Sequence, residues 1–243
     1  MTSQEFIAKL SPTAHQMMTL YQFKETKPLV LHITNNEENP CYMVYDNPDC
    51  YPVYINVDYL GAAAEEKFMH QFCHCVQIEE HFPSVKCVDE NDKDAKELAA
   101  AMNSIVLDMY VNAVMRRYGY VKNESEMLKK YTELTYRFRY FKENNIDVSK
   151  LGNKYSEYLY GLSIASVYFD CDTKKARELQ KNANQTSPKI RQYAGTFINV
   201  IKAYSYETAI GCHYIFDHLL EDLKLNDVLY VKPGEGIKTE ETK

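Results

Sequence analysis

The segment "EEKFMHQFCHCVQIEE", residues 65–80, decides how the rest of this sequence is interpreted. It contains no glycine or proline, and two glutamates stand at its start, where the helix dipole favours acidic side chains. The segment therefore predicts a helix, which Pro83 ends. Residues four apart lie one above the other on a helix, so His70 and His74 can direct both imidazoles at one cation.

Paired histidines at this spacing predict a zinc site. A catalytic zinc has three protein ligands, with nitrogen ligands at about 2.0–2.1 Å, and keeps one position for water. A carboxylate directly after the first histidine takes the proton of that water. Gln71 stands at this position, and its amide can bond the water but cannot accept the proton. Hydrolysis is therefore expected to be impaired, whether Gln71 is native or replaces a parent glutamate.

Around this helix the sequence predicts an α+β fold with a small N-terminal β-sheet packed on the motif helix. Three short strands are expected upstream, in "KPLVLHITNN", "CYMVYD" and "YPVYINVDYL". Residues 3–23 are expected to be helical with a break at Pro12. Residues 94–118 predict a long helix that Gly119 closes.

The rest of the chain predicts a mainly α-helical C-terminal region. Three or four helices are expected after residue 123, with breaks near "ENNIDVSKLGN", "DCDT" and "NQTSPK". The polar segment "SVKCVDENDKD" before the long helix is expected to be a linker. The predicted organisation is a metal-binding domain at 1–122, a helical subdomain at 123–228 and a flexible tail at 229–243.

Composition narrows the functional classes. The net charge is −6 and the basic residues are scattered, which argues against nucleic-acid binding. The start lacks the features of a signal peptide, and no apolar run reaches the roughly 18 residues of a membrane helix. The seven cysteines are expected to be mostly reduced thiols, and the expected location is the cytoplasm. The 21 tyrosines predict amphipathic packing, with a peptide-binding surface as the alternative.

The order of these elements resembles that of zincin-type (HExxH) metallopeptidases, with the glutamate replaced by Gln71. The resemblance covers roughly residues 28–120 and points to compact bacterial or phage proteins of the ImmA/IrrE style. It implies an edge strand bordering the cleft, then the motif helix, then a helix that supplies an acidic third ligand. An extended peptide substrate is then expected to pair with the strand near residues 53–58.

Three acidic residues compete for the role of third ligand. Asp108 stands among apolar residues on the second helix, where an unpaired charge would be costly to bury. Glu97 follows His74 at a spacing near that of the gluzincins, and Asp94 with Ala95 matches the acidic-alanine pair of the ImmA/IrrE type. Glu97 and Asp108 are three turns apart on one helix face, so both cannot reach one metal. Asp108 is the preferred candidate.

The other histidines and cysteines are interpreted as structural. His81 lies seven residues after His74, roughly 10 Å along a continuous helix. Cys73 and Cys75 point to different sides of a helix, so they cannot share an ion with Cys87 and are expected to be small buried hydrophobic residues. His213 and His218 are five apart, a poor spacing for one helix face.

Two functions follow from the sequence. The first is a zinc-dependent metallopeptidase-like protein that acts on a protein or peptide substrate. Its peptide-bond hydrolysis would be absent or impaired because Gln71 replaces the general base. The alternative is a non-catalytic protein-binding or regulatory module of bacterial or phage origin. The sequence gives no oligomeric state.

Overall fold

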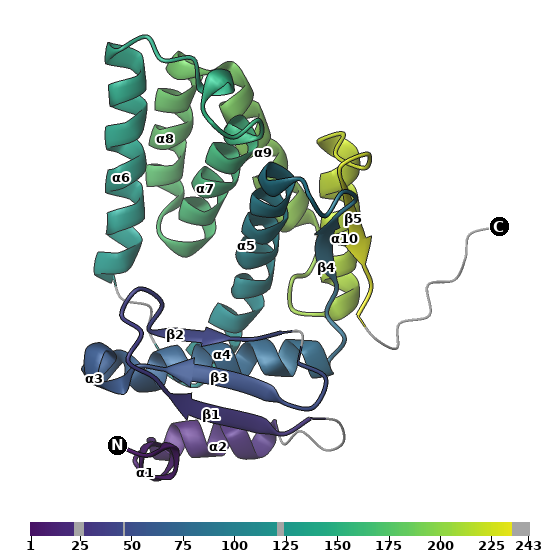
Figure 1. The fold of residues 1–243 in the computed structure, drawn as a ribbon. Helices are drawn as coiled ribbons and strands as arrows, with labels where there is room; N and C mark the ends of the chain where they lie inside the picture. The colour runs from purple at the N-terminus through teal and green to yellow at the C-terminus, as the bar shows by residue number, and fades with distance from the viewer. Residues whose placement is uncertain (22–26, 46, 121–123, 235–243) are drawn as a thin grey trace, which may run out of the picture. The chain divides into compact units, whose positions relative to one another are not determined.

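The computed structural model describes residues 1–21, 27–45, 47–120 and 124–234 (Figure 1). The chain forms two compact units. The sheet unit contains Met1–His81 and Val111–Val121, and the helical unit contains Phe82–Tyr110 and Lys122–Lys243. The predicted α+β class is confirmed, because a small sheet lies in the N-terminal part and the C-terminal part is helical. Unlike the domain boundary expected at residue 122, this division places residues 82–110 with the C-terminal region.

The sheet unit contains the three strands expected from the sequence. They are β1 (Leu29–Ile33), β2 (Cys41–Met43) and β3 (Tyr51–Ile55), in the order β1-β3-β2. Strand β3 is parallel to β1 and antiparallel to β2. It is therefore the central strand, and the expectation that residues 53–58 form an edge strand is wrong.

Strand β3 is also shorter than the sequence indicated. The chain leaves the sheet at Asn56, whose side chain accepts a hydrogen bond from the Tyr59 backbone and caps the short helix α3 (Val57–Leu60). A 3₁₀ turn, η1 (Gly61–Ala63), then leads into α4 (Ala64–Glu79). Gly61 has φ +52°, a conformation that favours glycine, so this residue turns the chain from α3 toward α4.

Helix α4 is the predicted motif helix, and it packs on the sheet through β2 and β3. Figure 1 shows α4 running behind the strands. The fully buried apolar side chains of α4 include Phe68, Met69 and Phe72, and those of β3 include Val53 and Ile55. The expectation of a small sheet packed on the motif helix is therefore confirmed.

The N-terminal helices are α1 (Ser3–Ala8) and α2 (Pro12–Leu20). The expected break is confirmed and lies just before Pro12, which occupies the first turn of α2, where its missing N–H costs nothing. Ser11 caps that helix, and Glu65 at the start of α4 accepts from both the backbone N–H (2.6 Å) and the hydroxyl (2.7 Å) of Ser11. Tyr120 donates its hydroxyl to the same carboxylate at 2.7 Å. Glu65 thus joins three segments of the sheet unit.

Helix α5 (Lys93–Arg117) contributes to both units, and Gly119 ends it at φ +82° as predicted. Among the described residues it is the single helix whose length and apolar composition would suit a membrane span. This is weak evidence for a membrane, because 56% of the apolar window is buried inside the protein, as in a core helix.

Residues 124–234, the described part of the helical unit after residue 123, contain five helices, one or two more than predicted. They are α6 (Glu124–Glu143), α7 (Ser156–Asp170), α8 (Thr173–Thr186), α9 (Pro188–Ala203) and α10 (Ala209–Asp222), with a 3₁₀ turn, η2 (Val148–Lys150). The three predicted breaks are confirmed. The missed break precedes α10, where Thr208 caps the helix through the Gly211 N–H. A side chain at Gly211 would collide with the Ser205 carbonyl, which fixes this turn.

A second sheet corrects two expectations for the helical unit. The expected linker contains β4 (Ser84–Cys87), which pairs antiparallel with β5 (Leu229–Lys232) from the start of the expected flexible tail. The Asn103 side chain on α5 accepts from the Val85 N–H at 2.7 Å and donates to the Val85 carbonyl at 2.9 Å. Residues 235–243 of the expected tail lie outside the described residues.

Candidate metal centre

Two histidines of α4 form the base of the candidate site. Their Nε2 atoms lie 3.2 Å apart, and the ring centroids are 4.9 Å apart at an interplanar angle of 80°. Two nitrogens bound to a tetrahedral zinc at about 2.0–2.1 Å are about 3.3–3.4 Å apart. The spacing of His70 and His74 therefore matches that of two ligands on one ion.

Asp108 on α5 completes the group. One ligand atom from each of His70, His74 and Asp108 lies within 4.8 Å of the others, and the described residues form one such group of three. Asp108 precedes by three residues the point at which α5 enters the sheet unit, to which α4 also belongs. Its carboxylate also accepts a hydrogen bond from Ser104, one turn earlier, at 3.2 Å. The structure thus brings together the three residues preferred as ligands from the sequence, and this group could hold a metal ion.

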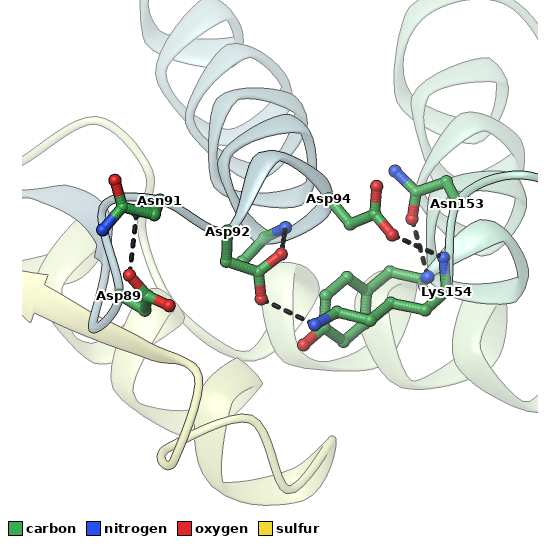
Figure 2. Close-up of polar contacts among 8 residues, drawn as sticks. Asp89, Asn91, Asp92, Asp94, Asn153 and Lys154 are labelled. Carbon is green, nitrogen blue, oxygen red and sulfur yellow. Dashed lines mark hydrogen bonds and ion pairs between the residues drawn. The ribbon is translucent and has the colours of Figure 1, made fainter.

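The rival third ligands bind elsewhere in the helical unit. Figure 2 shows Asp94 accepting from the backbone N–H of Lys154 at 3.0 Å, while the Lys154 ammonium contacts Asp92 at 2.7 Å. Glu97 is exposed and accepts from the Asn153 side chain at 2.7 Å. Both rival carboxylates hold the segment before α7 against the start of α5. Neither belongs to the group of His70, His74 and Asp108.

The surroundings of His74 are more enclosed than those of its two partners. Its side chain is buried, whereas His70 and Asp108 are half-buried. The Nδ1 atom of His74 lies 2.8 Å from Oε1 of Gln77, which is also buried. The Tyr45 ring stands edge-on to His74 at a centroid distance of 6.4 Å. Sequence reasoning missed Gln77, although its place three residues after His74 on a predicted helix was a signal for it.

Gln71 follows His70 on α4 and is half-buried. Its backbone carbonyl lies 3.4 Å from the Cys75 Sγ, within the same helix. Its side-chain amide cannot take a proton from water at neutral pH. The arrangement can therefore bind a cation, but position 71 supplies no general base.

His81 and the cysteines lie outside the metal group, among the described residues. His81 is exposed and has φ +59°, so the helix has already ended there. Burial raises the pKa of the Cys73 and Cys75 thiols, the latter to about 12, and Cys75 contacts Met43 with its Sγ 3.0 Å from Sδ. A raised thiol pKa disfavours a nucleophilic role and agrees with interpreting both thiols as core residues. Cys87 is half-buried in β4.

The two histidines of α10 have partners on their own helix. His213 Nε2 lies 3.2 Å from Asp217, and His218 Nδ1 lies 3.9 Å from Glu221. The His218 ring also stacks on Tyr204 at a centroid distance of 4.8 Å. These contacts fit the expectation of structural histidines at the rim of the last helix.

Similarity to known proteins does not identify the site. Comparisons with protein-family models, with curated proteins and with solved structures found no match for this chain.

Proposed function

We propose that the chain is a zinc-binding, metallopeptidase-like protein whose metal is held by His70, His74 and Asp108. The observation that supports this most is the convergence of two histidines of α4, whose Nε2 atoms lie 3.2 Å apart, with Asp108 of α5. Two imidazoles and one carboxylate form a donor set that suits zinc and leaves its fourth position open. Zinc held there would supply an activated water and polarise a carbonyl.

The protein residues define how far hydrolysis can proceed. Gln71 can hydrogen-bond a water but cannot remove its proton, and loss of a general base costs typically 10²–10⁴-fold in rate. With Gln71 at this position, the chain is therefore proposed to bind a peptide but to cleave it slowly or not at all. Restoring a carboxylate at position 71 would supply the missing base.

The strand order of the sheet indicates that the substrate would pair with a strand other than the expected one at residues 53–58. Because β3 is central, an extended peptide would have to pair with one of the outer strands, β1 or β2. Both are edge strands, and β2 is the one that is a principal contact of α4, the helix that carries the histidines. We therefore propose that a protein or peptide substrate lies along β2. We also propose a cytoplasmic location, with neither nucleic acid nor a membrane as a partner.

A non-catalytic regulatory module is the second candidate, and Gln71 is the observation that favours it. If the glutamine is native, the metal would have a structural role and the protein would bind its partner without cleaving it. The half-buried position of Gln71 beside the group is compatible with either role.

The deciding experiment compares peptide cleavage by the zinc-loaded protein with that of Gln71→Glu. A library of fluorogenic peptides and denatured casein would serve as substrates, and Gln71→Met would serve as the matched control. Cleavage that rises about 10²–10⁴-fold in Gln71→Glu alone, and stops with a chelator, would support the peptidase. Zinc binding without cleavage by Gln71→Glu would favour the regulatory module.

A further inference from the structure

A buried glutamine beside the metal group has a role that neither proposed function assigns. We infer that Gln77 is a positioning residue, which fixes the tautomer of His74 so that its Nε2 lone pair faces the metal. This inference rests on the proposed metal site of His70, His74 and Asp108.

The hydrogen bond between Gln77 and His74 defines the tautomer. The Gln77 Oε1 atom lies 2.8 Å from His74 Nδ1, and an amide oxygen can only accept. The hydrogen of this bond must therefore be on Nδ1. A neutral imidazole carries one N–H, so Nε2 of His74 is left with its lone pair.

That lone pair faces His70. His74 Nε2 lies 3.2 Å from His70 Nε2, and both residues belong to the group that includes Asp108. Without a metal, His70 donates from Nε2 to His74. When a metal binds, His70 must move its hydrogen to Nδ1, whereas His74 already has the required tautomer. The two ligands thus differ in how far they are organised for binding.

Burial makes this hydrogen bond hard to replace. Gln77 is 2% exposed and His74 is 8% exposed, so water has little access to substitute for the amide. Gln77 lies three residues after His74 on α4, which holds the amide beside the ring. Partners of this kind orient metal-ligating histidines, and their loss typically costs 10–100-fold in metal affinity.

The first test measures zinc affinity by competition with a chromophoric chelator. Gln77→Met keeps the size of the side chain but removes the acceptor, and it is expected to lose about 10–100-fold in affinity. Gln77→Glu restores an acceptor and should bind within a few-fold of the original. Val76→Ala, which truncates a buried neighbour, controls for destabilisation and should lower the melting temperature without a comparable loss of affinity. Unchanged affinity in Gln77→Met would overturn the inference.

The second test uses the metal-free protein and does not depend on zinc. Nitrogen-15 NMR of the imidazoles should show His74 with its hydrogen on Nδ1, and Gln77→Met should shift it toward the Nε2–H tautomer. An Nε2–H tautomer of His74 in the original chain would contradict the inference. A chain that binds no zinc but shows the Nδ1–H tautomer would refute the metal site while leaving the hydrogen-bond assignment intact. Zinc binding that Gln77→Met leaves unchanged would refute only the role of Gln77.

Discussion

The Nε2 atoms of His70 and His74 lie 3.2 Å apart, close enough for one ion to bind both. The helical spacing of the two residues brings the rings to one face of α4, and packing determines the rest of the arrangement. Asp108 arrives from α5 as the third donor.

The first prediction concerns the third ligand. Asp108→Asn removes the negative charge while keeping the size of the side chain, so zinc affinity should fall at least about tenfold. Glu97→Gln and Asp94→Asn are the matched controls, because their carboxylates bond to residues 153 and 154 instead. Chelator competition measures all three. An affinity loss in Glu97→Gln with none in Asp108→Asn would reverse the assignment.

The second prediction concerns pH and the carboxylate of Glu65. Burial raises the pKa of Glu65, but hydrogen bonds from Ser11 and Tyr120 outweigh it and hold the pKa below the usual value of 4.5. A lowered folded-state pKa contributes stability that is full above the unfolded-state pKa and is lost as the pH falls through the folded-state pKa. Glu65→Gln should therefore lower the free energy of unfolding by about 1–2 kcal/mol at pH 7, with a smaller difference in acid.

Urea denaturation of metal-free protein at neutral and acidic pH tests the role of Glu65. Glu66→Gln, one residue away, is the control, and its free energy of unfolding should equal that of the original chain at both pH values. An equal loss at pH 7 and in acid would show that the charge of Glu65 does not contribute.

The third prediction concerns the contact between α7 and α9. A Cβ at Gly161 would stand 2.8 Å from the Tyr193 Cβ and 3.0 Å from the Ala194 backbone nitrogen. Gly161→Ala should therefore destabilise the protein by about 1–3 kcal/mol, despite the better helix propensity of alanine. Among the described residues, no heavy atom outside its own stretch of α9 lies within 4 Å of a Cβ placed at Gly195, so Gly195→Ala should be neutral or stabilising by up to about 1 kcal/mol. Thermal unfolding that ranks the two variants the other way would contradict this packing.

The sequence predicted the parts of the fold that local pattern determines. Short β-forming runs beside turn residues identified β1 to β3, with clear alternation in β3. Helix-forming composition identified α4 and α5, and a closing glycine marked the end of α5. Strands β4 and β5 were missed because each is four residues long and pairs with a segment that is distant in the sequence. The central position of β3 could not be predicted from the sequence either, since strand order depends on pairing between distant segments.

The site shows the same division. The histidine pair follows from the helical period, which acts within a few residues. The identity of the third ligand does not follow from the helical period. Asp108, Glu97 and Asp94 lie on one helix, and only tertiary packing determines which of them reaches the histidines. In the structure, Asp94 and Glu97 accept hydrogen bonds from the segment before α7, whereas Asp108 lies in the group with the two histidines.

The most direct measurement is the zinc content of the purified chain, by elemental mass spectrometry under chelator-free conditions. His70→Ala is the test variant, and His81→Asn, at an exposed histidine outside the group, is its control. The proposed site predicts about one zinc per chain in the original and in His81→Asn, and a loss of zinc in His70→Ala. Zinc absent from the original chain, or retained fully in His70→Ala, would contradict the metal centre.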